Sequence, residues 1–187
     1  MTIFALSSGK GRAGVSIIRV SGPATKQAIL SLTATEILPV ERMATLRWFY
    51  HPLTHEKIDQ GIVVFFPGPK SFTGEDVAEF HIHGGNAVIE QFLTVLSGLP
   101  NLRMAEAGEF TRRAFDNDKM DLTAVEGLSD LINSETEGQR KQALRQMQGS
   151  LAHLYEEWRS QLITAMAYLE ADIDFLKKKY RMMLLRV

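Results

Sequence analysis

The sequence predicts an α+β protein built from two parts. Short β-rich runs separated by Gly and Pro extend to about residue 105, and two helical segments fit between them. From about Glu109 the apolar residues recur instead at helical spacing. With 187 residues, the chain can form one ordinary domain or two small ones. We therefore expect a mixed sheet with packed helices, followed by an α-helical part.

Five short segments rich in Val, Ile, Phe and Tyr are the predicted strands. A first helix is expected from Pro23, whose fixed backbone angle suits a first helical turn, to about Leu32. A second helix is expected over Asn86–Ser97, ended by Gly98 and Pro100. The predicted strands are Ile3–Leu6, Val15–Val20, Ala44–Tyr50, Ile62–Phe66 and Val77–Ile82.

The last third of the chain is predicted to form two or three helices. Thr123 with Glu126, and Ser134 with Glu137, have the spacing of capping boxes. A longer apolar stripe runs from Leu151 to Leu169 at helical spacing. Such a stripe needs an apolar surface to cover it.

The composition excludes several classes of protein. The 21 basic and 22 acidic residues give a net charge of −1, which argues against a broad nucleic-acid-binding surface. The absence of Cys excludes disulfide scaffolds, thiolate zinc sites and cysteine nucleophiles. No apolar run approaches the roughly 18–20 residues that span a bilayer, and the first residues lack the pattern of a signal peptide. We expect no membrane partner and a cytoplasmic protein.

The sequence supports neither of two common nucleotide-binding motifs. Residues 9–14 match G-x-G-x-x-G, but a β-rich segment follows where a dinucleotide site requires a helix. A flexible turn is the simpler interpretation, with Lys10 and Arg12 as local anion contacts. The sequence contains no G-x-x-x-x-G-K-[ST], so no phosphate-binding P-loop is expected.

The densest polar stretch covers residues 72–85. Glu79, His81 and His83 alternate and would project from one face of a strand. Three interpretations stay open: a metal site, histidines bonded locally at a sheet edge, and a ligand pocket near Gly84. Glu79 suits a pocket, because a carboxylate accepts two N–H donors of a pterin-like ring.

Two basic residues are further candidates. Arg19 interrupts an apolar strand and needs a partner or a ligand anion. Lys119 lies between Asp118 and Asp121 in a segment with charges of both signs, where a surface ion pair is the alternative.

Three long motifs, in this order, resemble the family of the tRNA modification GTPase MnmE, also called TrmE. They are G-R-A-G-V-S-I-I-R-V-S-G at 11–22, F-P-G-P-K-S-F-T-G-E-D-V-A-E-F-H-I-H-G-G at 66–85 and G-E-F-T-R-R-A-F-D-N-D-K-M-D-L-T-A-V-E-G-L-S-D-L-I at 108–132. The resemblance covers about residues 2 to 175.

The resemblance implies a folate-binding N-terminal domain, similar in fold to an aminomethyltransferase, that forms a homodimer. A helical domain follows, into which a G domain is inserted. With the flavoprotein MnmG, the family modifies carbon 5 of the wobble uridine of certain tRNAs. In the family, the G domain hydrolyses GTP and uses Mg and K.

Carried over to this sequence, the folate contacts fall on Arg19, Glu79 and Lys119. The expected cofactor is 5-formyl- or 5,10-methylene-tetrahydrofolate. Glu79 would hold the pterin edge, and the two basic residues would hold carboxylate or formyl oxygens. The resemblance implies no catalytic residue and no metal ligand in this chain.

The resemblance also implies a division of the chain. Residues 1–118 would be the folate-binding and dimerisation domain, and 119–175 the first part of the helical domain. Residues 176–187 are basic where the family is acidic, and a frameshift just after Phe175 is one hypothesis for this tail. Without a P-loop in the sequence, we expect no GTPase activity from this chain alone.

Two other functions stay open. The chain could be a folate-dependent enzyme of the aminomethyltransferase type, or a non-enzymatic helical interaction protein. Folate binding would exclude the interaction protein, because only the tRNA modification protein and the aminomethyltransferase are expected to bind folate. Dependence on MnmG separates the tRNA modification protein from the aminomethyltransferase.

Overall fold

A computed structural model describes the backbone of residues 1–9 and 11–184, and the side chains of this part as far as residue 175. The chain divides into two compact units, Met1–Met120 and Asp121–Val187. Lys10, predicted to be an anion contact, lies outside the described residues, as do 185–187 and the side chains of the rest of the basic tail.

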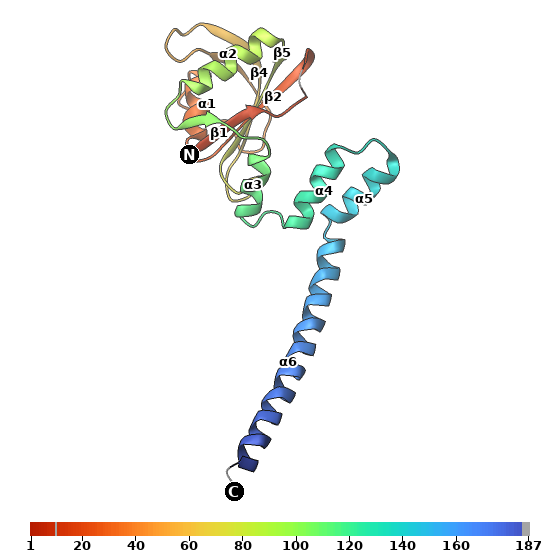
Figure 1. Cartoon of the computed structure of the whole chain (residues 1–187). Coiled ribbons are helices and arrows are strands. Elements are labelled where there is room, and N and C mark those ends of the chain that lie inside the picture. The colour runs from red at the N-terminus through yellow and green to blue at the C-terminus, as the bar shows by residue number, and fades with distance from the viewer. Residues whose placement is uncertain (10, 185–187) are drawn as a thin grey trace. The chain divides into compact units, whose positions relative to one another are not determined.

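The first unit is built around one mixed sheet of six strands (Figure 1), as the α+β prediction requires. Its spatial order is β3-β4-β5-β2-β1-β6. All neighbouring strands are antiparallel except β1 and β6, which are parallel. The strands are β1 (Thr2–Leu6), β2 (Ala13–Ser21), β3 (Thr45–Tyr50), β4 (Lys57–Phe66), β5 (Val77–Gly84) and β6 (Leu102–Met104).

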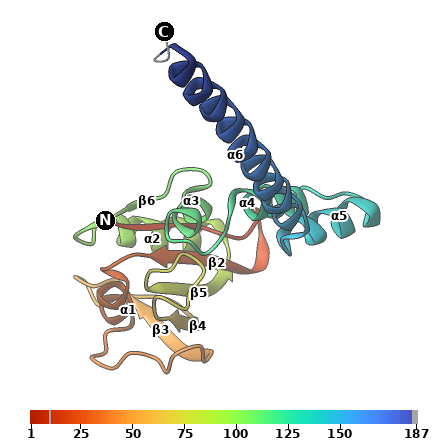
Figure 2. The same ribbon diagram turned by 90° about the horizontal axis from the view of Figure 1, so that it is seen from below.

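Two helices supply the core on one face of the sheet. They are α1 (Thr25–Thr33), which lies beside β3 (Figure 2), and α2 (Asn86–Ser97). Alternate residues of β2 and β5, such as Ile18, Val20 and Phe80, are fully buried with them. Phe80 packs edge-on against Phe49 at 5.6 Å between ring centroids, and Phe92 of α2 lies 5.3 Å from both rings. The opposite face of β2 and β5 is left for the polar residues described below.

A short helix closes the first unit. This helix, α3 (Glu109–Asp116), begins after Gly108, which adopts the left-handed conformation. Glu109 lies in its first turn and Arg113 in its last, the order that the helix dipole favours. The helix brings Phe110 and Arg113 to the face of the sheet that carries Arg19.

The second unit is helical, with α4 (Leu122–Ile132), α5 (Glu137–Met147) and α6 (Ser150–Leu184). Both predicted capping boxes are wrong. Asp121, not Thr123, caps α4 by accepting a hydrogen bond from the Ala124 N–H at 2.7 Å, because its carboxylate stands one position before the first helical residue. Thr136, not Ser134, caps α5, in a capping box with Gln139.

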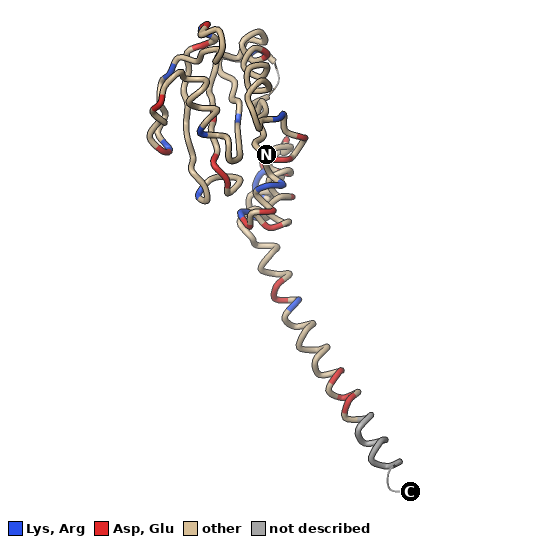
Figure 3. Tube along the Cα trace, turned by 90° about the vertical axis from the view of Figure 1, so that its left-hand side faces the viewer, with Lys and Arg blue, Asp and Glu red and all other residues tan. Residues whose placement is uncertain are grey.

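The backbone of α6 continues from the predicted apolar stripe into the basic segment. A ten-residue stretch, 160–169, contains no charged residue. It lies in the tan run between the coloured groups of α6 in Figure 3. Its large apolar side chains are exposed, including Leu162 at 64% and Met166 at 64%. None of the helices in the described part of the chain has the length and hydropathy of a membrane span.

Candidate functional site

Arg19 and Glu79 form the centre of the candidate site. They are direct partners in the register of β2 and β5, so both side chains project from the sheet face opposite the core. Arg19 donates to Glu79 Oε1 from Nη2 at 2.7 Å and from Nε at 3.0 Å. Arg19, the charged residue that interrupts β2, thus has its partner on the neighbouring strand β5. Both side chains are partly accessible, at 26% for Arg19 and 19% for Glu79.

Two aromatic rings accompany the guanidinium of Arg19. Its Cζ lies 5.3 Å from the ring centroid of Phe72 and 5.7 Å from that of Phe110. Phe72 belongs to the loop between β4 and β5, and Phe110 belongs to α3. A planar cation held near two aromatic faces gains attraction from the ring quadrupoles, so both rings restrict the orientation of Arg19.

His81 extends the same face along β5. Its Nε2 lies 3.6 Å from Glu79 Oε2, beyond hydrogen-bond distance. That nitrogen is buried and has no hydrogen-bond partner among the residues that the structure describes. The imidazole as a whole keeps 29% exposure. Glu79 therefore uses Oε1 for Arg19, while Oε2 and His81 Nε2 face each other without a bond.

Lys119 reaches the same loop from the end of the first unit. Its Cε lies 3.0 Å from the point where a Cβ on Gly74 would stand, and Asn117 lies equally near. The Asn117 side chain donates to the Thr73 carbonyl at 2.7 Å. The Lys119 side chain is thus brought to the loop that carries Phe72, while the structure gives it no contact with Arg19 or Glu79.

A network of ion pairs and hydrogen bonds fixes this loop against β2 and α3. Arg113 donates to Glu75 Oε2 at 2.8 Å, and the Ser21 hydroxyl donates to the same oxygen at 3.0 Å. Ser21 also bonds the Thr73 hydroxyl at 2.7 Å. Because Phe72 lies in this loop and Phe110 in α3, the network sets both rings around Arg19.

Glu109 anchors the start of α3 from a nearly closed environment. Its side chain is 2% exposed and receives two hydrogen bonds from Arg103, one of them at 2.8 Å from Nη1 to Oε2. The backbone N–H of Glu106 and the guanidinium of Arg113 add further donors at 2.9 and 3.2 Å. Chiefly through the Arg103 bonds, the pKa of Glu109 falls from 4.5 to about 2.

The alternating histidines do not form a metal cluster. His83 bonds Asp59 instead, with 2.7 Å between Nδ1 and Oδ1. Within the part of the chain that the structure describes, no group of three or more His, Cys, Asp or Glu residues is placed to hold a metal ion. The predicted local bonding of a histidine is confirmed for His83, but not at a sheet edge. Its strand β5 is the third of six and lies between β4 and β2, so it is not an edge strand.

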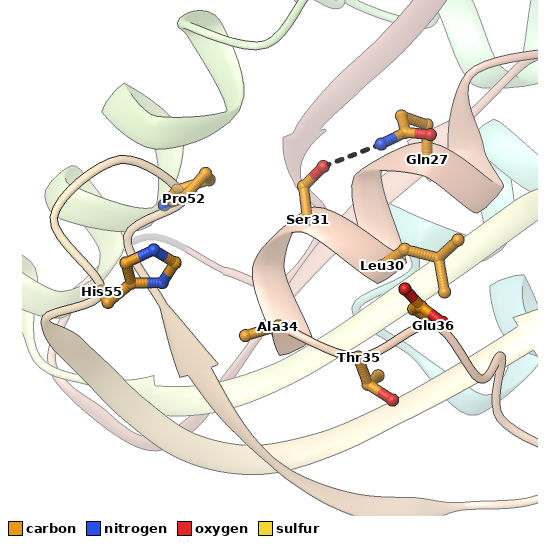
Figure 4. Close-up of a pocket in the computed structure, with 8 residues that line it drawn as sticks. All are labelled: Gln27, Leu30, Ser31, Ala34, Thr35, Glu36, Pro52 and His55. Atoms are coloured by element: carbon orange, nitrogen blue, oxygen red, sulfur yellow. Dashed lines mark hydrogen bonds between the residues drawn. The ribbon is translucent and has the colours of Figure 1, made fainter.

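Two hollows lie elsewhere on the first unit. One, of about 550 Å³, is shown in Figure 4 between the end of α1 and the turn after β3. Gln27 donates to Ser31 at 3.2 Å along its wall, and His55 stands opposite. The other, of about 370 Å³, lies near the start of α2 and includes Lys57 and Gln91. Neither is lined by Arg19, Glu79 or Lys119.

The sequence predicts Arg19 and Glu79 as site residues but does not predict the residues that hold them. Phe72, Phe110, Glu75 and Arg113 lie inside the quoted motifs, but no spacing rule links them to Arg19. Their contacts join positions 38 to 92 residues apart, which only the folded chain reveals. Apart from the family motifs, the signal was a charged residue inside an apolar strand, since such a residue needs a partner.

Comparisons with known proteins match the two parts of the chain to two family models. Residues 2–119 match the family model of the GTP-binding protein TrmE N-terminus, and residues 122–183 match that of the MnmE helical domain. Together the two matches cover nearly the whole sequence.

Curated relatives match over 174 residues, 93% of this chain. The tRNA modification GTPase MnmE of Parvibaculum lavamentivorans is 57% identical, and the match covers 40% of its length. The mitochondrial 5-taurinomethyluridine tRNA synthase subunit GTPB3 is 59% identical in Danio rerio and 57% in Homo sapiens, with 34% and 35% of those proteins covered. The chain thus spans 34–40% of the length of these relatives, and it belongs to the MnmE family of tRNA modification GTPases.

Proposed function

We propose that this chain is a folate-binding and dimerising part of a tRNA wobble-uridine modification protein. The observation that carries the proposal is the partly exposed Arg19–Glu79 pair, next to a Glu79 oxygen and a histidine nitrogen that have no hydrogen bond within the described residues. The two family-model matches favour this function over an aminomethyltransferase or an interaction protein, because they join the sheet unit to a helical domain.

The residues of the site fit a tetrahydrofolate. Glu79 Oε2 has lone pairs for the ring N–H donors of a pterin. Arg19 is positioned to meet an anionic or formyl oxygen, and its two aromatic neighbours restrict its orientation. Lys119, at the nearby loop, supplies a second positive charge for the carboxylates of the glutamate tail. The chain's own contribution is therefore to bind and orient the one-carbon carrier.

An exposed apolar strip supports the homodimer. Leu46 of β3 pairs with Ile62 of β4, which in turn pairs with His81 of β5, so all three side chains share the face that carries the site. Leu46 is 62% exposed, Trp48 is 41% exposed and Ile62 is 37% exposed. Apolar side chains exposed together mark an interaction surface. A second copy that covered this strip would enclose the folate site.

The proposed partners and the proposed nucleotide follow from the family. The curated relatives are named for tRNA modification and, for MnmE, for GTPase activity. We propose that this chain acts in the same modification, with MnmG and tRNA as partners. GTP, Mg and K would be used by a G domain, for which this sequence has no P-loop. The cytoplasmic location stays a prediction, and the GTPB3 relatives are mitochondrial by name.

Calorimetric titration of 5-formyltetrahydrofolate into the purified chain tests the folate proposal. We expect saturable binding, lost in Arg19→Ala and retained in Arg140→Ala, which removes an exposed arginine on α5. Equal binding by all three proteins would place the ligand elsewhere. Sedimentation velocity tests the dimer, which Leu46→Glu should weaken because it places a charge in the apolar strip.

A further inference from the structure

We infer that His81 is a specificity residue that, together with Glu79, reads the lactam edge of the pterin ring. This inference rests on the folate binding proposed above and adds a residue that the resemblance does not supply. The buried Nε2 of His81 has no hydrogen-bond partner within the described part of the chain. A buried polar atom without a partner costs free energy, so its position indicates a missing partner.

The geometry indicates what that partner offers. Glu79 Oε1 already accepts two hydrogen bonds from Arg19, so Oε2 is the oxygen left for a ligand. His81 Nε2 lies 3.6 Å from Oε2, too far for a direct bond. Two adjacent polar groups on one planar ring can bond these atoms, one to Glu79 Oε2 and the other to His81 Nε2. The pair therefore fits a ring with two neighbouring hydrogen-bonding groups.

The carboxylate sets the direction of these bonds. Glu79 Oε2 only accepts, so it requires an N–H on the ligand. The same negative oxygen favours a hydrogen on the His81 nitrogen that faces it, whether the imidazole is neutral or protonated. His81 Nε2 then donates, and it requires a carbonyl oxygen on the ligand. An N–H beside a carbonyl is a lactam edge, which the oxidised and reduced pterins of folates present.

The surroundings of His81 hold it in place for this role. It pairs with Ile17 of β2 on one side and Ile62 of β4 on the other, so its strand is fixed from both edges. The backbone of β4 approaches closely at Gly61, where a Cβ would stand 2.1 Å from the His81 carbonyl oxygen. The imidazole is therefore set on a rigid strand, as a specificity residue requires.

Guanine and uracil also carry a lactam edge, so the ligand must be identified by comparison. The proposal commits to the pterin, because Lys119 supplies a positive charge for the carboxylates of the glutamate tail, which neither base carries. The discriminating probe is the 4-amino counterpart of 5-formyltetrahydrofolate, in which an amine replaces the ring carbonyl and the neighbouring nitrogen loses its hydrogen. Against this probe both Glu79 and His81 lose their partners.

The test measures the affinity of the full chain for both folates, as wild type and as His81→Leu and His81→Gln. We expect wild type to prefer the 4-oxo ligand, and His81→Leu to reduce that preference about tenfold, the effect of one hydrogen bond to a polar ligand group. His81→Gln retains a side-chain N–H donor and should restore most of the preference. Thermal unfolding of each variant checks that the fold is intact.

The outcomes separate this inference from the folate proposal. If wild type binds 5-formyltetrahydrofolate and His81→Leu keeps the full 4-oxo preference, the role of His81 is wrong while folate binding stands. If wild type binds neither folate, both proposals fail. If guanosine or uridine monophosphate binds more tightly than the folate, and this binding depends on His81, then His81 reads a lactam edge but the pterin is the wrong ligand.

Discussion

Arg113 of α3 bonds Glu75 of the β4–β5 loop at 2.8 Å, and so joins the two elements that carry the aromatic neighbours of Arg19. Arg113 is 15% exposed and also donates hydrogen bonds to Glu109 and to the Met1 carbonyl. One side chain therefore connects the first residue, the loop and the helix. The positions of Phe72 and Phe110 beside Arg19 therefore depend on this connection.

Removal of Arg113 should destabilise the first unit. Arg113→Ala leaves Glu75 and the nearly buried Glu109 without a shared cation, and we expect a loss of about 2 kcal/mol in the free energy of unfolding. Arg112→Ala is the matched control, because that arginine is 60% exposed and its partner Glu106 is 69% exposed. The control should change stability by less than about 0.5 kcal/mol in urea unfolding. Equal losses in both variants would contradict the structural role of Arg113.

Acid should destabilise the protein through Glu109. The pKa of this carboxyl is about 2 in the fold against an ordinary 4.5, because Arg103 stabilises its charged form. Its contribution is therefore complete above pH 4.5 and is lost as the pH falls toward 2. The pKa difference corresponds to about 3 kcal/mol. Urea midpoints measured between pH 6 and 3 should fall more steeply for wild type than for Glu109→Gln, and parallel curves would contradict this account.

Substitution of Gly61 by any residue with a side chain should destabilise the sheet. A Cβ at this position would stand 2.1 Å from the His81 carbonyl oxygen and 3.0 Å from the Phe49 ring. Gly61→Ala must therefore separate β4 from β5, and we expect a loss of more than about 2 kcal/mol. Gly14→Ala on β2 meets nothing within 4 Å and is the control. Thermal unfolding compares the two variants, and similar melting temperatures would show that the strands tolerate the change.

Hydrogen exchange should differ between α2 and α6. Phe92 and Leu96 of α2 are fully buried, whereas Leu162 and Met166 of α6 are each 64% exposed. A helix with few buried contacts opens locally at low free-energy cost. In this chain studied alone, amides of 160–169 should exchange much faster than those of Asn86–Ser97. Equal protection would indicate that α6 is covered, for example by a second copy.

Local patterns predicted most of the elements. The helix expected over Asn86–Ser97 has the predicted bounds, because an apolar face and a following Gly and Pro define both ends. The strand β6 was not predicted, since Leu-Arg-Met is too short to show alternation and is held by β1. The caps of α4 and α5 were misplaced because several residues there can cap, and the backbone selects among them.

The candidate site was less predictable than the fold. The sequence indicated that Arg19 needs a partner, but only the register of β2 against β5 identifies that partner as Glu79. The parity of Glu79 and His81 correctly placed both on one face. The distance of 3.6 Å between their polar atoms, and the approach of Phe72 and Phe110 to Arg19, depend on tertiary packing that no local pattern encodes.

The central claim is that Glu79 holds the pterin of a folate. The most direct measurement is the equilibrium dissociation constant of 5-formyltetrahydrofolate for wild type, for Glu79→Gln and for Glu157→Gln, an exposed glutamate on α6. We expect one folate bound per chain in wild type and in Glu157→Gln, and at least about tenfold weaker binding in Glu79→Gln, whose amide cannot accept as the carboxylate does. Unchanged affinity in Glu79→Gln would contradict the account.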